Sequence, residues 1–258
     1  MSPKDNLRQR QKVGTRSEMR LGYGSEFQLL RCLGHHRCEF DNHIRNALSL
    51  SMSAPIVWLD FPSDTSRCSL DGEWKSIECF RPYFSASYLQ LKKEWRKYWP
   101  SVKSAMSWDA VFKVDNVWHF VEAKARAKEI ETTGCGAKEK SRRIIEKALD
   151  KARDGLFKDS ATKPWYGGEA EKAYQLANRL AFLWFCKTQS IPARIVYIEF
   201  LNGFVSPMSD SSVRSKAEWD SIWKSQWNRL GIPERLGESF ISRICIDCKT
   251  IGCWNKRP

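Results

Sequence analysis

Two segments rich in β-forming residues, separated by only two residues, constrain the fold of this chain more than any other feature. Residues 108–114 and 117–125 are dominated by Val, Phe, Trp and Ala, and Asp115-Asn116 lies between them. A two-residue connection of this composition is typical of a tight hairpin turn. The sequence therefore predicts two strands that pair antiparallel through this turn.

The second predicted strand carries charges on an otherwise apolar segment. Glu122 and Lys124 are two residues apart, so both project to the same side of the strand. Because Trp118 and Phe120 make this strand a buried one, placing two charges on it carries a large desolvation cost. Asp109, at the start of the first strand, can reach the same end of the sheet. Two acids and a lysine are therefore expected to converge.

The rest of the chain alternates helical and strand patterns. Apolar residues at helical spacing predict helices over 26–33, 88–99, 138–157, 169–187 and 217–230. Apolar runs predict strands over 56–59, 193–201 and 239–248. Residues 64–84 are rich in turn residues and are expected to form a long surface connection. This order of elements predicts an α/β fold with a central mixed β-sheet flanked by helices.

The first predicted helix has its own start and stop signals. Ser25 and Gln28 have capping-box spacing, which makes Ser25 the expected N-cap, and Gly34 is expected to end the helix. Glu26 shares the side of the helix that carries the leucines. It is either a first-turn acid favoured by the helix dipole or a carboxylate directed inward at a site.

The net charge of the chain indicates which classes of partner it is expected to bind. The chain has 258 residues and a formal net charge of +13, and a folded chain this basic is expected to meet a polyanion or an anionic surface. No apolar run approaches the ~18–20 residues that span a bilayer, so no membrane partner is expected. Residues 1–20 are either a flexible basic arm or a merely solvated tail, and 21–258 are expected to form one domain.

The nine cysteines lack the spacing of a disulfide framework. Because the basic amino terminus has no secretory signal, we expect reduced thiols in the cytoplasm. Cys245, Cys248 and Cys253 have a spacing that structural zinc can use, but a second Cys-x2-Cys pair and a nearby histidine are missing. We therefore interpret these cysteines as small hydrophobic residues on a strand.

Three histidines are candidates for a metal site or a general base. His35 and His36 follow Gly34 without the spacing of a zinc site, and we interpret them as surface or turn residues. His119 alternates with Glu122 and Lys124, so it is expected to point to the opposite face of the sheet.

The convergence of Asp109, Glu122 and Lys124 fits metal-assisted hydrolysis of a phosphodiester. Two carboxylates hold a hard divalent cation, which neutralises the phosphate and lowers the pKa of its bound water. A lysine beside them stabilises the charge that develops in the transition state. The alternative is a structural ion pair between Glu122 and Lys124, because an acid-x-Lys tripeptide is very common.

With Glu26 on a preceding helix and a helix after the strand, Asp109 and Glu122-Ala123-Lys124 resemble the PD-(D/E)XK nuclease superfamily, which has the restriction-endonuclease-like fold. The residue before Asp109 is Trp108, where the family pattern has proline. The resemblance implies a nuclease that depends on Mg²⁺ or Mn²⁺.

The resemblance also implies roles for individual residues. Asp109, Glu122 and the carbonyl of Ala123 bind the metal, while Glu26 and Lys124 complete the catalytic set. Some members add a Gln from a following helix; here Gln175, Asn178 and Arg179 are the candidates for substrate binding. Gln175 is otherwise a residue that forms hydrogen bonds within the fold.

The sequence leaves three hypotheses for function. The first is a metal-dependent nuclease acting on nucleic acid, with DNA favoured over RNA. The second is a catalytically inactive nucleic-acid-binding protein of the same fold. The third is a basic α/β interaction protein in which Glu122 and Lys124 form a structural pair. The presence of all three polar residues favours the enzyme. The oligomeric state is left open.

Overall fold

A five-stranded mixed sheet forms the centre of the fold. The computed structural model describes residues 24–59, 73–85, 87–100, 106–158, 163–203 and 212–251. The sheet order is β1-β4-β5-β6-β7, with β1 Val57–Trp58, β4 Ala110–Val114, β5 Val117–Lys124, β6 Ala193–Leu201 and β7 Ile241–Asp247. A separate two-stranded sheet pairs β2 Trp74–Lys75 with β3 Ser107–Trp108.

Strand direction changes at β5, in the middle of the large sheet. β4 is antiparallel to both β1 and β5, whereas β5, β6 and β7 run parallel. In the parallel register Glu122 lies beside Tyr197 and Lys124 beside Glu199. The carboxyl ends of three parallel strands therefore meet at one edge of the sheet, which is the edge that carries the polar residues.

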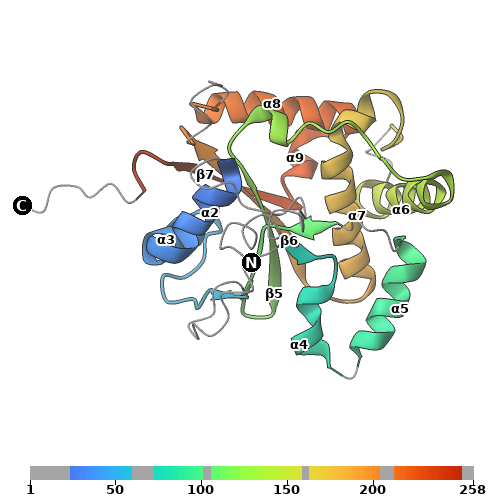
Figure 1. The fold of residues 1–258 in the computed structure, drawn as a ribbon, viewed down its shortest axis with the longest axis horizontal. Helices are drawn as coiled ribbons and strands as arrows, with labels where there is room; N and C mark the ends of the chain where they lie inside the picture. Colours follow the sequence, from blue (N-terminus) through green and yellow to red (C-terminus); the bar gives the residue numbers. More distant parts are fainter. Residues whose placement is uncertain are drawn as a thin grey trace, which may run out of the picture.

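Helices cover both faces of the sheet (Figure 1). On one face lie α2 Gly24–His35 and α3 Arg37–Ala47; on the other lie α5 Tyr88–Tyr98, α6 Glu139–Phe157, α7 Tyr174–Thr188 and α8 Lys216–Leu230. The shorter elements are η2 Glu78–Phe80, α4 Arg81–Phe84, η3 Ala127–Glu129, η5 Gly168–Ala173 and α9 Glu234–Gly237. No helix in the described ranges is both long enough and apolar enough to cross a bilayer.

Most of the predicted elements are confirmed. The hairpin turn, the strand over 193–201 and the helices beginning near 88, 138 and 217 lie within a residue or two of their predicted bounds. Local sequence explains this agreement for α8, where the Ser215 hydroxyl accepts the Glu218 N–H and Gly231 ends the helix at a φ of 64°. The expected α/β architecture with a mixed central sheet is present.

Four local predictions are wrong. The strand predicted over 108–114 is broken at Asp109, which lies in a bend between β3 and β4. α2 already begins at Gly24 and runs to His35, so Ser25 lies inside its first turn and Gly34 does not end it. The helix predicted from 169 is a 3₁₀ helix up to Ala173.

The fourth wrong prediction is the surface connection over 64–84. Of its described part, Ile77, Cys79 and Phe80 are buried in the core beside α5 and α7. Residues 64–72 lie outside the described ranges, as does the predicted basic arm over 1–20.

Aromatic packing holds α7 against the sheet. The ring of Phe182 is fully buried. Its centroid lies 4.7 Å from that of Phe120 on β5 and 5.0 Å from that of Trp108. On the outer side, Gly155 of α6 lies so close to Trp184 of α7 that an added Cβ would come within 2.4 Å of its ring. α7 is therefore fixed between the sheet and α6.

We predict that Phe182→Ala lowers the free energy of unfolding by about 3–5 kcal/mol, because it leaves a cavity among aromatic rings. Urea unfolding followed by circular dichroism measures the change. The exposed Leu89 provides a control, since Leu89→Ala should change stability by less than about 0.5 kcal/mol. A loss of under 1 kcal/mol for Phe182→Ala would contradict the packing described.

Candidate active site

Asp109 turns inward where the chain leaves the β4–β5 ladder. The β4–β5 register ends where Ala110 pairs with Val121, and Asp109 lies in the bend just before it. Its main-chain N–H donates to the Val121 carbonyl at 3.0 Å, and its side-chain Oδ2 accepts the Ala123 N–H at 2.7 Å. The carboxylate thus takes the place of a ladder carbonyl and is fixed beside β5.

Glu122 and Lys124 share one face of β5, as predicted, and both are buried. Their side chains meet at 3.0 Å between Lys124 Nζ and Glu122 Oε2. Glu122 is 1% exposed and Lys124 6%. Trp118 and Phe120 precede them on the same face and belong to the core, so the strand passes from apolar to charged within one face.

Arg179 of α7 completes the environment of Glu122. Its Nε donates to Glu122 Oε1 at 2.6 Å, and its Nη2 forms an ion pair with the same oxygen. Nη2 also donates to the Ser107 carbonyl at 2.8 Å, and the guanidinium carbon lies 4.7 Å from the centre of the Trp108 ring. Glu122 is therefore held between two cations.

Further acids approach the same end of β5. Glu26, in the first turn of α2, is half-buried, and its pKa is raised by burial and by Glu73 and Glu129, while Lys124 opposes the shift. Glu129 accepts the Ala125 N–H at 2.7 Å directly after β5. The structure thus brings Glu26 from the opposite layer to the neighbourhood of Lys124.

Burial and charge set the ionisation of the cluster. Burial and the nearby Glu122 raise the pKa of Asp109 to about 7, although Lys124 and the Ala123 N–H oppose this. Burial alone would raise the pKa of Glu122, but Arg179 and Lys124 together outweigh it and lower that pKa. Burial likewise acts to lower the pKa of Lys124, and Glu122 and Asp109 outweigh it. Glu122 and Lys124 are therefore ionised at neutral pH, while Asp109 titrates near it.

The donor chemistry of this site fits a hard divalent ion. Asp109 and Glu122 offer carboxylate oxygens, which Mg²⁺ and Mn²⁺ prefer, with water completing the coordination. The main chain of Ala123 lies against Asp109, because its N–H donates to Asp109 Oδ2; its carbonyl is the oxygen that the resemblance assigns to the metal. Among described residues, no cluster of three or more His, Cys, Asp or Glu side chains could hold a metal alone. An ion here would depend on two side chains, a carbonyl and water.

The other predicted residues divide into near and distant groups. Asn178 accepts a hydrogen bond from Arg179 Nη1 at 2.8 Å, and Gln175 lies one turn earlier on the same side of α7. His119 stacks on Phe112 on the face opposite Glu122, as predicted. His35 is exposed at the end of α2 and His36 lies in the bend that follows it.

Of the cysteines whose spacing structural zinc can use, which we interpreted as small hydrophobic residues, the two described ones lie on different sides of the sheet. Cys245 on β7 packs against the core on the α7 side of the sheet, whereas Cys248 packs against the core on the α2 side. Cys253 lies outside the described ranges. All seven described cysteines are free thiols.

The sequence did not reveal which cation neutralises the Glu122 carboxylate. Arg179 was a candidate for substrate contact, but the structure places it on Glu122. Glu73 and Glu129 were not considered. The signal for Arg179 was present: a charged residue on a helix that is apolar around much of its circumference requires a buried partner.

A second buried ion pair lies on β6, the strand next to β5, on the face of the sheet that also carries Glu122. Glu199 of β6 accepts bonds from Arg243 Nε at 2.6 Å and from Trp223 Nε1 at 2.6 Å. Glu199 is 1% exposed. This pair is separate from Glu122 and provides a matched comparison for it.

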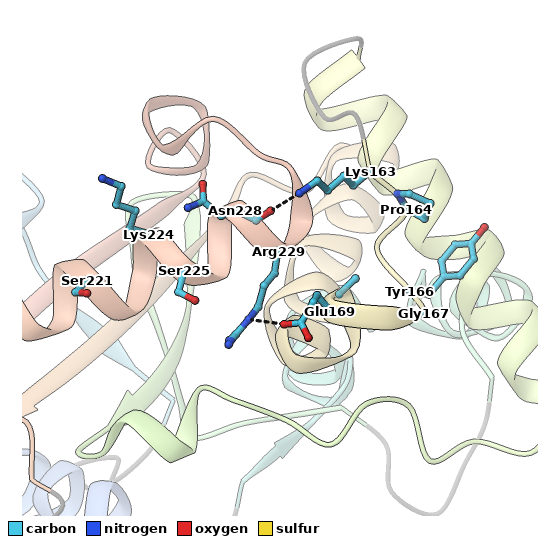
Figure 2. Close-up of a pocket in the computed structure, with 11 residues that line it drawn as sticks. Lys163, Pro164, Tyr166, Gly167, Glu169, Ser221, Lys224, Ser225, Asn228 and Arg229 are labelled. Carbon is cyan, nitrogen blue, oxygen red and sulfur yellow. Dashed lines mark hydrogen bonds and ion pairs between the residues drawn. The ribbon is translucent and has the colours of Figure 1, made fainter.

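A surface cavity of about 710 Å³ lies between α8 and the segment before η5. Figure 2 shows Ser221, Lys224, Ser225 and Asn228 along α8, and the Lys163 ammonium donates to the Asn228 carbonyl at 3.2 Å. Arg229 at its wall also pairs with Glu131, in the loop that follows β5, at 2.8 Å. Its cations outnumber its single acid, Glu169.

Comparison with protein-family models, curated proteins and solved structures gave no match for this chain. The case for a function therefore rests on the geometry of the site.

We predict that the stability of the protein depends on the ionisation of Asp109. Because its pKa is about 7 in the folded chain and ordinarily 3.8, the folded state binds more protons between these values. The free energy of unfolding should therefore fall as pH rises from about 4 to 7, by up to about 1.4 kcal/mol per pH unit. Glu122, whose pKa is lowered from 4.5, acts in the opposite sense only at more acidic pH.

The Asp109→Asn variant should lose this part of the pH dependence. Urea unfolding of both proteins between pH 4 and 8 measures it. Parallel curves for the two proteins over that range would mean that Asp109 does not titrate there.

Proposed function

We propose that this protein is a nuclease of the restriction-endonuclease-like fold that uses Mg²⁺ or Mn²⁺ to hydrolyse phosphodiester bonds in nucleic acid, DNA rather than RNA. One observation carries the proposal: Asp109, Glu122 and Lys124 meet at the carboxyl end of the central strand β5. Two carboxylates and an amine gathered at one point, with Glu122 and Lys124 buried and Asp109 half-buried, are costly to fold, and metal-assisted phosphodiester hydrolysis is a chemistry that requires them.

Each residue has a defined role in this proposal. Asp109, Glu122 and the Ala123 carbonyl hold the ion, which, when bound, activates water and neutralises the phosphate. Lys124 places its ammonium beside these acids, where it stabilises charge developing on the phosphate oxygens. Glu26 contributes a further carboxylate from α2.

The charge of the chain supports a nucleic-acid partner. The net charge is +13, and the cavity on α8 presents Lys163, Lys224 and Arg229 beside serine hydroxyls and an amide. Lys, Arg, Ser and Asn are the side chains that commonly contact phosphates. Arg229 at the wall of this cavity pairs with Glu131 in the loop that follows β5.

A second candidate function has an observation of its own in its favour. Both oxygens of Glu122 are already bonded, one to Arg179 and one to Lys124. A protein that binds nucleic acid without cleaving it would keep these ion pairs as structure. Cleavage assays separate the two candidates.

We predict that Asp109→Asn and Glu122→Gln each reduce cleavage by orders of magnitude, because each removes a charged oxygen ligand. Lys124→Met should spare metal binding and reduce the rate by about 100-fold or more. Plasmid, linear DNA and structured RNA, incubated with Mg²⁺, Mn²⁺ or EDTA, serve as the test.

Glu199→Gln is the matched control for these variants, since it alters a buried, ion-paired acid on the neighbouring strand. It should cost stability and leave cleavage intact at a temperature where the protein is folded. If wild type cleaves and folded Asp109→Asn cleaves at the same rate, the activity does not belong to this site. If wild type binds DNA but does not cleave under any condition, the second candidate holds.

We further predict that the lysines of the cavity contribute to DNA binding. In the Glu122→Gln background, which suppresses cleavage, the double substitution Lys163→Gln and Lys224→Gln should weaken binding of a DNA duplex. Removing two phosphate contacts should make the negative slope of log K against log salt concentration shallower by about 1.8. Fluorescence anisotropy at several salt concentrations provides the measurement. Lys92→Gln with Lys93→Gln on α5 removes the same charge elsewhere, and an equal effect of that pair would mean that the cavity makes no special contribution.

A further inference from the structure

The bonds to Glu122 conflict with its proposed role as a metal ligand. Arg179 donates to Oε1 and Lys124 to Oε2, so a divalent ion must displace at least one of them. Glu122 and Arg179 are 1% and 5% exposed, so the competition takes place away from bulk water. One carboxylate cannot neutralise two monovalent cations and a divalent ion together.

We infer that Arg179 is a built-in cation that occupies Glu122 in the absence of metal and competes with the divalent ion for that carboxylate. This inference rests on the proposed function. Arg179 acts here as a positioning residue, because it controls the availability of a ligand and is not itself a ligand.

The contacts of Arg179 explain why it, and not Lys124, is displaced. Its guanidinium has partners that do not involve Glu122: Nη2 donates to the Ser107 carbonyl, Nη1 donates to Asn178, and the Trp108 ring lies beneath it. The guanidinium can therefore leave Glu122 and keep most of its bonds. The Lys124 ammonium, which comes from the same strand, donates its hydrogen bond to Glu122 itself.

The same contacts explain how a buried site is stable without metal. Leaving a buried carboxylate with too few partners is strongly destabilising, and Arg179 supplies the charge that the ion would supply. The inference therefore makes two linked claims: Arg179 stabilises the metal-free protein and weakens its affinity for metal.

The test uses Mn²⁺ as the probe and requires no cleavage. In full-length Arg179→Gln, calorimetry should show Mn²⁺ binding at least about tenfold tighter than in wild type, because the competing cation is gone. The melting temperature without metal should fall, and saturating Mn²⁺ should raise it by more than it raises that of wild type. A purely structural role for Arg179 would lower stability without tightening metal binding.

Two further variants locate and control the effect. Arg243→Gln removes an arginine from the equivalent buried pair with Glu199, so it should lower stability and leave the Mn²⁺ affinity unchanged. Glu122→Gln combined with Arg179→Gln should abolish the tightened binding. If Arg179→Gln does not fold, Arg179→Lys keeps the charge with fewer bonds, and a smaller tightening of at least twofold is expected.

The outcomes separate this inference from the proposed function. If wild type and Arg179→Gln bind Mn²⁺ equally, the inference is overturned while the metal site stands. Weaker binding by the variant also overturns it, since Arg179 would then hold Glu122 in its ligand geometry. If neither protein binds Mn²⁺ at any pH from 6 to 9, the metal site itself is rejected, and the inference falls with it.

Discussion

A carboxylate with almost no access to water, paired with two cations, is the constraint on which this structure depends. Burying Glu122 is favourable only if its charge is compensated at short range. Lys124 is available from the same strand, but the second cation must come from α7. The position of α7 over β5, the bend at Asp109 and the carbonyl of Ser107 all serve to bring Arg179 to that point.

Aromatic packing provides the rigidity that this charge pairing requires. Trp108 contacts both Phe120 of the strand and Phe182 of the helix, and the Arg179 guanidinium lies over its ring. The tyrosine at the end of α5 adds a second support, because its hydroxyl lies 3.0 Å from carbonyls of both α6 and α7. The polar site thus packs against a continuous apolar layer. A small shift of α7 would change the bonds that Arg179 makes to Glu122.

The helices and strands that could be predicted from the sequence are those that local apolar patterns and cap residues specify. The apolar run of β6 and the cap residues of α8 determine their bounds without reference to the rest of the chain. The break at Asp109 was not predictable in this way, because a side-chain oxygen replaces a ladder carbonyl there. The face shared by Glu122 and Lys124 followed from strand alternation, whereas the position of Arg179 depends on how a helix 57 residues further along packs in three dimensions.

The parallel pairing of β5 with β6 has a consequence for the order in which the chain assembles. Asp109, Glu122 and Lys124 belong to one hairpin closed by a two-residue turn, whereas β6 is reached only after α6 and α7. Contacts close in sequence form before distant ones, since closing a long loop costs more entropy. During synthesis the acids and the lysine therefore meet while still hydrated. Dehydration of the charges awaits the docking of α7, so the burial of these charges goes with the pairing of β5 and β6, two strands that are far apart in the sequence.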